Sequence, residues 1–314
     1  MPMRYRTAFF LCLLAFCLTA FPQEGDDLLT LRILTYNIRH GAGMDDVIDL
    51  DRQAAVIRNA TPDIVGLQEV DSCVKRSSYV PQAAVLGEKA GMYATFGPAI
   101  PLTGGKYGVA ILSKEQPLSV RNIPLPGKEK RTLLVCEFQE YVFACTHLDL
   151  DDSCRLASVP IILEEAAQWE KPFFICGDWN DQPTSTLITR LKRSFSFLNN
   201  LTDNTTNYTF PADKPNRIID YIASYGIGTN RVAKSIRKRQ VIYEPVASDH
   251  RPVLVELKLD RYTTDIHGPS PDSFLYGGEM YNLAGQRVTP PRGGDGRGLP
   301  RGIYIINGKK FIQQ

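Results

Sequence analysis

Seven polar side chains stand directly beside short apolar runs of the sequence. They are Asn37, Glu69, His147, Asp178, Asn180, Asp249 and His250. Carboxylate and amide oxygens are the ligands that Mg²⁺ prefers, and histidine and aspartate can move protons to or from a reacting group. Each residue alone is more often a turn residue or a satisfied hydrogen-bond partner. Because strands that end at one sheet edge bring such groups into one cleft, the repeated pattern predicts an active site.

The apolar runs alternate with helical patterns, and these elements must position the polar groups. Strands are predicted at residues 31–36, 64–68, 108–112, 132–138, 141–146, 172–176, 218–222 and 253–257. Helices are predicted at residues 50–59, 82–90 and 159–169. Continuous apolar strands mixed with helices are typical of sheets that helices cover. The sequence therefore predicts one α/β domain over residues 25–260.

The composition is that of an ordinary folded protein, with 43% hydrophobic and 22% charged residues in a chain of 314. It excludes a disordered chain, a collagen-like repeat and a disulfide-dense miniprotein. A net charge of +2 also excludes a wholesale polyanion binder of the histone kind. Residues 1–20 carry +2 and residues 261–314 carry +3, so the central body is net −3. Any anionic ligand must find its positive charge locally.

The N-terminal segment, residues 1–20, has the pattern of a secretory signal. Arg4 and Arg6 precede an apolar run of about 12 residues, which is too short to span a bilayer with ease. We expect cleavage near Ala20 and an exported protein that is periplasmic, on the cell surface or extracellular. The alternative is an uncleaved N-terminal anchor.

The five cysteines that follow this segment are an odd number, so at least one is unpaired. Cys136, Cys145 and Cys176 lie in apolar runs and are expected to be buried free thiols. Cys73 and Cys154 lie in loop-like stretches, where a disulfide between them remains open.

The C-terminal segment, residues 261–314, differs from the body in its sequence pattern. A linker at residues 267–271 precedes two short predicted strands near residues 281–288 and 302–308, too little to bury a core. The segment resembles the C-terminal sorting segments of some secreted bacterial proteins. That resemblance implies export or sorting machinery as a partner, and no obligate protein partner is otherwise expected. The alternative is a small strand appendage packed on the body.

Taken together, the motifs of the body resemble those of the endonuclease/exonuclease/phosphatase superfamily. The matching segments, in order, are Thr35-Tyr-Asn-Ile38, Leu67-Gln-Glu-Val70, Tyr107-Gly-Val-Ala-Ile-Leu112, Thr146-His-Leu148, Gly177-Asp-Trp-Asn180, Ile219-Asp-Tyr-Ile222 and Ser248-Asp-His250. The resemblance implies a four-layered α/β/β/α sandwich of two packed mixed sheets flanked by helices. It also implies Mg²⁺ or Mn²⁺ and hydrolysis of a phosphate ester by in-line attack of water.

The metal would be held, on this resemblance, by Glu69 and Asn37, with Asp249 beside them. Asp178 would orient or deprotonate the attacking water. Asn180 would hold that water or a phosphoryl oxygen.

Two histidines, His147 and His250, would donate to the non-bridging oxygens of the phosphate as negative charge concentrates there. Asp249 has a second possible role, in which it orients a histidine and favours the cationic form.

Five further residues are weaker candidates. Asp220 would orient a site residue or close a structural hydrogen bond. Arg39 and His40 could contact substrate or brace their loop. Arg131 and Arg155 could contact phosphate or lie at solvated ends of their elements.

The substrate stays open at the level of sequence, because one fold serves many substrates. A small or accessible phosphodiester is the first expectation, a nucleic acid the second and a phospholipid headgroup, as for a sphingomyelinase, the third. The basic stretch at residues 231–239 could follow a polyanion, although a solvated strand face explains it as well. A non-catalytic surface binding module is the alternative from a different class.

Overall fold

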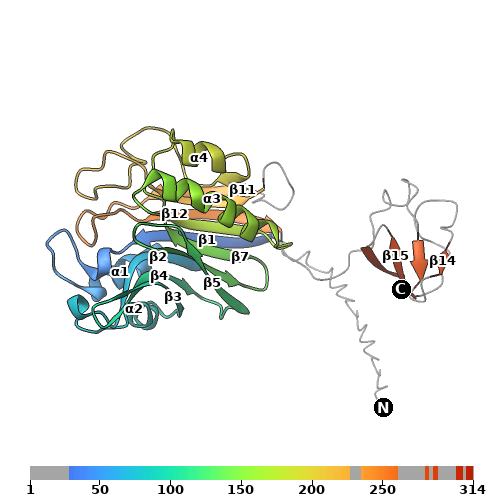
Figure 1. The fold of residues 1–314 in the computed structure, drawn as a ribbon, viewed down its shortest axis with the longest axis horizontal. Helices are drawn as coiled ribbons and strands as arrows, with labels where there is room; N and C mark the ends of the chain where they lie inside the picture. The colour runs from blue at the N-terminus through green and yellow to red at the C-terminus, as the bar shows by residue number, and fades with distance from the viewer. Residues whose placement is uncertain are drawn as a thin grey trace, which may run out of the picture.

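Residues 28–226 and 235–260 of the computed structural model form two six-stranded mixed sheets with helices on their outer faces (Figure 1). The structure also describes residues 280–282, 286–288, 302–306 and 309–313. The signal predicted at residues 1–20 and the linker predicted at residues 267–271 lie outside the described residues. In the described part of the chain, no helix is long and apolar enough to cross a membrane.

The first sheet has the strand order β11-β12-β1-β2-β4-β3. Its strands are β1 (Leu28–Asn37), β2 (Ile64–Ser72), β3 (Tyr93–Leu102), β4 (Gly105–Ser113), β11 (Ser235–Val241) and β12 (Val253–Asp260). β1 and β2 are parallel, and Asn37 at the end of β1 lies beside Gln68. The other neighbours in this sheet pair antiparallel.

The second sheet has the order β5-β6-β7-β8-β10-β9. Its strands are β5 (Ser119–Leu125), β6 (Arg131–Glu137), β7 (Val142–His147), β8 (Phe173–Asp178), β9 (Phe195–Phe197) and β10 (Asp220–Tyr225). β7 and β8 are parallel, so His147 and Asp178 end neighbouring strands in register. β10 runs antiparallel to β8 and places Asp220 opposite Asp178.

Successive side chains of each strand point to opposite faces of its sheet, and they pack into three separate hydrophobic cores. In β1, Leu31 and Ile33 face the second sheet, whereas Leu34 and Tyr36 face the helices on the other side. Helices α1 (Leu50–Ala60) and α2 (Gln82–Ala90) cover that outer face of the first sheet. Helices α3 (Asp152–Ala167) and α4 (Thr186–Leu191) cover the second sheet. The four-layered sandwich expected from sequence is confirmed.

Local signals set most of the helix ends. Asp49 caps α1 by accepting a hydrogen bond from the Arg52 amide, and α2 ends before Gly91, whose φ of +68° suits glycine. The third helix begins earlier than the sequence predicts, at Asp152 rather than at residue 159. It begins at Asp152 because the Asp151 side chain accepts from the amides of Ser153 and Cys154, and Pro160 lies inside it.

Several edge elements escaped the sequence-based prediction. β3 and β5 lie at the ends of their sheets and are largely half-buried or exposed, so they lack a continuous apolar run. The C-terminal segment also holds more than the two strands expected. Its four strands form one sheet in the order β14-β13-β15-β16: β13 (Met280–Asn282), β14 (Arg287–Val288), β15 (Gly302–Ile306) and β16 (Lys309–Gln313).

All five cysteines of the body are free thiols. Cys136, Cys145 and Cys176 are buried between the sheets, as expected. Cys73 and Cys154 do not form the disulfide that the sequence left open.

Candidate active site

The strand ends of both sheets deliver polar side chains to one edge of the sandwich. Asn37 ends β1, His147 ends β7 and Asp178 ends β8, and all three side chains are buried. The loop before β12 adds His250, which is 4% exposed. The convergence predicted for these residues is therefore present in the fold.

Asp178 lies at the centre of the group. Its Oδ2 atom accepts a hydrogen bond from Asn37 Nδ2 at 3.1 Å and lies 3.5 Å from Nε2 of both His147 and His250. Its Oδ1 atom accepts from the Asn180 amide at 2.9 Å. Burial raises the pKa of Asp178 to about 7, although the positive charge of His250 opposes this rise. A carboxylate with that pKa is suited to accept a proton near neutral pH.

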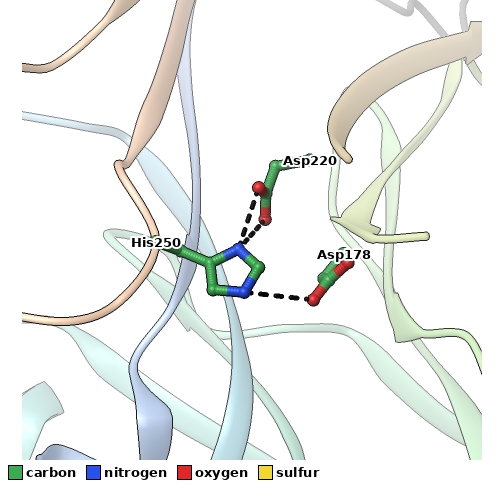
Figure 2. Close-up of side chains that lie close together, drawn as sticks. All are labelled: Asp178, Asp220 and His250. Atoms are coloured by element: carbon green, nitrogen blue, oxygen red, sulfur yellow. Dashed lines mark hydrogen bonds and ion pairs between the residues drawn. The ribbon is translucent and has the colours of Figure 1, made fainter. Parts of the chain in front are cut away.

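His250 is held between two carboxylates (Figure 2). Its Nδ1 atom lies 3.0 Å from Asp220 Oδ2, and its Nε2 atom faces Asp178. Burial alone would lower the pKa of His250, but Asp220 and Asp178 outweigh it and raise the pKa to about 10. Asp220, rather than Asp249, is thus the residue that orients this histidine and keeps it cationic.

His147 behaves in the opposite way. Burial, together with the charges of Arg131 and His250, holds its pKa well below the usual range, so the ring is neutral. The Asn180 side-chain nitrogen donates to His147 Nε2 at 3.0 Å, and the buried Nδ1 atom has no partner within the described residues. In this arrangement His147 Nε2 accepts a hydrogen bond, whereas the sequence-based expectation was that it donates.

Two of the site residues adopt backbone conformations that are rare outside glycine. Glu69 has a φ of +58° and lies at a bulge where the β2–β4 register shifts between Leu67 and Val70. Asn180 has a φ of +51° directly after β8. Such strain persists where the surroundings hold a functional side chain in place, and bulges re-aim side chains next to active sites.

The residues expected to hold a metal lie together at the first sheet. Asn37 Nδ2 donates to Glu69 Oε1 at 3.0 Å, and Asn37 Oδ1 accepts from the Arg39 amide. Burial raises the pKa of Glu69, Asn37 lowers it, and the charge of Asp249 raises it further. Within the described residues Glu69 has no ion-pair partner, and Arg39 lies 3.8 Å from Asp249. A cation would offset the remaining negative charge of the two carboxylates, so the donor set fits a hard divalent ion. Asn37 could offer its side-chain oxygen to the ion beside Glu69 only after its amide group flips by a half-turn, because the nitrogen now faces Glu69.

A second group, formed by Asp178, Asp220 and His250, also has ligand atoms within 4.8 Å of one another. Both ring nitrogens of His250 face a carboxylate, and its raised pKa keeps the ring protonated. The hydrogen bonds and charges within this group account for the close approach of its three side chains.

Of the weaker candidates, one lines the cleft and the others do not. Arg131 lines the cleft, with Glu129 2.9 Å and Asp149 3.6 Å from its guanidinium. Asp220 holds His250, and the remaining three candidates, Arg39, His40 and Arg155, do not line the cleft.

Internal contacts hold these three side chains or their segments. Arg39 pairs with Asp46 and lies 3.8 Å from Asp249. The His40 carbonyl accepts from Gln82, and burial lowers the pKa of its ring. Arg155 donates to the Asp149 carbonyl.

The cleft itself has a volume of about 590 Å³ and includes residues that the sequence did not predict as site residues. Tyr107, Leu150, Phe210 and Arg217 line it beside the central carboxylates. Leu150 is 75% exposed, although it follows a buried strand end closely. Phe210 and Arg217 come from the long loop before β10, where the sequence carries no strand-end signal. Tyr107 alone had a signal, because it begins a quoted motif.

Solved structures share this fold at low sequence identity. An endonuclease/exonuclease/phosphatase from Beutenbergia cavernae DSM 12333 is 19% identical with a TM-score of 0.59, over 90% of this chain and 92% of that chain. A mannosyl-6-phosphatase from Bacteroides thetaiotaomicron VPI-5482 is 18% identical with a TM-score of 0.57, over 72% and 99%. ANGEL2, a 2′,3′-cyclic phosphatase, is 14% identical with a TM-score of 0.58, over 75% and 97%. No curated protein matches in sequence.

The fold and the buried carboxylate–histidine centre together define a two-sheet phosphoesterase. The sequence profile of the Endonuclease/Exonuclease/phosphatase family matches residues 34–250, and the chain belongs to this family. Members of the family are phosphoesterase hydrolases that generally use divalent metals, and the chain is an enzyme of that class.

Proposed function

We propose that this enzyme is an exported, Mg²⁺- or Mn²⁺-dependent hydrolase that cleaves phosphodiesters by in-line attack of water. The observation that carries the proposal is the position of Asp178. Its carboxylate is buried and lies 3.5 Å from two histidine nitrogens, one on a neutral ring and one on a cationic ring. A proton acceptor and a positive donor therefore face the same cleft.

Asp178 is the group that takes the proton of the attacking water. Its pKa of about 7 leaves much of the carboxylate ionised at neutral pH. Asn180 assists by holding the water. Both hydrogens of its side-chain nitrogen are used by His147 Nε2 and the Leu148 carbonyl, so its oxygen is the atom left to accept from water.

His250 stabilises the charge that develops on the phosphoryl oxygens. Asp220 fixes its Nδ1–H, so the Nε2–H side of the cationic ring faces the cleft beside Asp178. A preorganised positive donor of this kind contributes more in a buried site than in water.

Glu69 and Asp249 are the residues that would hold the divalent ion, with the Asn37 amide beside them. When bound, such an ion polarises a phosphoryl oxygen and offsets charge on the leaving oxygen. The chain supplies two carboxylates that both line the cleft, and within the described residues no cationic side chain forms an ion pair with Glu69.

A small or accessible phosphodiester is the substrate that we favour. Arg237 and Lys238 of the basic stretch are exposed on β11, but no residue of that strand lines the cleft. This arrangement offers little support for a long nucleic-acid track, so a nuclease is the second candidate and a sphingomyelinase-like phospholipase the third. A non-catalytic binding module is disfavoured because each polar residue of the predicted site is present.

Export remains part of the proposal and depends on residues 1–20 and 261–314. N-terminal sequencing of protein secreted by its native host would find a mature chain beginning near residue 21. An N-terminus still at Met1 in the secreted or membrane fraction would contradict cleavage.

An assay panel tests the activity. Purified mature protein is incubated with bis-p-nitrophenyl phosphate, single- and double-stranded DNA, RNA, sphingomyelin and sugar or inositol phosphates, each with Mg²⁺, with Mn²⁺ and with EDTA. We expect metal-dependent turnover of a diester and none in EDTA. Binding of metal without turnover of any phosphate ester would favour the binding module instead.

A further inference from the structure

Arg217 is a cation that lines the cleft and has no role in the proposed chemistry. It is exposed, it lines the cleft and it lies three residues before the start of β10 at Asp220. Its guanidinium carbon lies 4.8 Å from the centre of the Phe210 ring. Arginine stacked on an aromatic ring is partly preorganised, so less side-chain entropy is lost when its N–H groups bind a ligand.

The other cations of the cleft already have carboxylate partners. Arg131 has Glu129 and Asp149 as partners, and cationic His250 has Asp220 and Asp178. Across the described ranges, the structure places no carboxylate within ion-pair distance of Arg217. Arg217 is thus an uncompensated positive charge on the wall of a cleft in a body with excess acid.

The position of this charge relative to the reaction centre is set by Phe210. The Phe210 ring centre lies 4.7 Å from the His250 ring centre, and Arg217 packs over the same ring. The free guanidinium and the histidine that faces the phosphate in our proposal therefore both lie within 4.8 Å of the centre of one phenyl ring. A substrate with its reacting phosphate at His250 would place a second group within reach of Arg217.

We propose that Arg217 binds a second phosphate group of the substrate, so that the enzyme prefers phosphate esters carrying another phosphate near the scissile one. This inference rests on the proposed function and narrows its substrate class. A guanidinium can bind a phosphate through two parallel hydrogen bonds, which gives both direction and strength. A small bisphosphate and the next phosphate of a nucleic-acid strand share this chemistry.

Binding in EDTA tests the proposal without metal-dependent turnover. Dissociation constants are measured by titration calorimetry for two pairs: glucose 6-phosphate against glucose 1,6-bisphosphate, and TpT against pTpT. We expect the wild-type protein to bind the doubly phosphorylated member about tenfold more tightly in at least one pair. The sugar pair and the nucleotide pair distinguish a small bisphosphate from a strand.

Variants then assign the preference to Arg217. Arg217→Ala should bring the ratio close to one, and Arg217→Lys should leave an intermediate ratio, because lysine keeps the charge but loses the planar fork. Arg190→Ala is the matched control, since Arg190 is exposed on α4 and does not line the cleft. It should keep the wild-type ratio.

A wild-type ratio near one in both pairs would overturn the proposal, and so would a preference that survives in Arg217→Ala. The same pairs are next assayed with Mg²⁺. A binding preference that Arg217→Ala abolishes, without turnover of any substrate, would refute the proposed function and leave the second phosphate site standing. Turnover of a substrate without any binding preference for the doubly phosphorylated member would refute the second phosphate site and leave the proposed function standing.

Discussion

Asp178 and Asp220 stand opposite each other on the antiparallel strands β8 and β10, and the His250 ring lies between their carboxylates. The sheet register therefore builds an Asp–His–Asp chain from three distant parts of the sequence. One end of this chain, Asp220, is buried and supports the histidine. The other end, Asp178, faces the cleft, where a proton acceptor is needed.

The Asp220→Asn variant should lower the pKa of His250. Burial alone lowers this pKa, and Asp220 is the largest contribution that raises it to about 10. NMR titration of the histidine ring in EDTA, with wild type as reference, measures the change. A His250 that titrates at the same pH in both proteins would contradict the assignment.

The Asp220→Asn variant should also change how the unfolding free energy depends on pH. Because the folded pKa of His250 is raised above 6.5 to about 10, its contribution is fully present below pH 6.5 and is lost as pH rises toward 10. The difference in unfolding free energy between wild type and Asp220→Asn should be about 3 kcal/mol near pH 6.5 and shrink toward pH 10. Urea titrations at several pH values measure it, and a difference that grows with pH would be inconsistent.

Glu69→Gln should weaken divalent-metal binding. The substitution keeps the shape of the side chain but removes the charge that a hard cation needs, so affinity for Mg²⁺ should fall by at least about tenfold. Titration calorimetry measures this directly. Glu88→Gln on α2 is the control, because Glu88 is exposed and outside the cleft. Equal Mg²⁺ affinity in Glu69→Gln and the control would remove Glu69 from the metal site.

The two sheets approach so closely at Gly66 that a larger residue should destabilise the fold. An alanine Cβ there would lie 2.1 Å from Cys176 Sγ and 3.0 Å from Cys145 Sγ. We expect Gly66→Ala to lose about 1–3 kcal/mol of unfolding free energy in urea. Adding Cys176→Ala should recover part of that loss, whereas strictly additive effects of the two substitutions would show that this contact is not the cause.

The thiols of the mature chain should all be free. After denaturation without reductant, iodoacetamide should add to five cysteines, as counted by mass spectrometry. In the native protein Cys73 should react first because it is exposed, while burial raises the pKa of Cys136 to about 12 and slows its reaction. A mass showing only three additions would reveal a disulfide.

The sequence could predict the strands that carry the site because they are buried on both faces and read as unbroken apolar runs. β8, for example, is buried along its whole length and ends at Asp178. β5 was missed because it lies at a sheet edge and exposes Arg121 and Asn122. Such edge strands form because they pair with a neighbouring strand, and no local sequence pattern marks them.

In the candidate site, too, some features follow from local sequence and others depend on how the strands pair. That Asp178 and His250 meet follows from where β8 ends and β12 begins. That Asp220, and not the neighbouring Asp249, holds His250 depends on the β8–β10 register, which no local pattern contains. Arg217 was invisible for a similar reason, since only the folded loop packs it over Phe210 at the cleft.

The most direct test of the account is the turnover of Asp178→Asn on bis-p-nitrophenyl phosphate with saturating Mg²⁺, compared with wild type and with the exposed control Asp213→Asn. Circular dichroism and urea unfolding confirm that each variant is folded. We predict that kcat falls at least about 100-fold in Asp178→Asn, because the group that accepts the water's proton is gone, and that it stays near wild type in the control. Equal turnover by folded Asp178→Asn and wild type would contradict it.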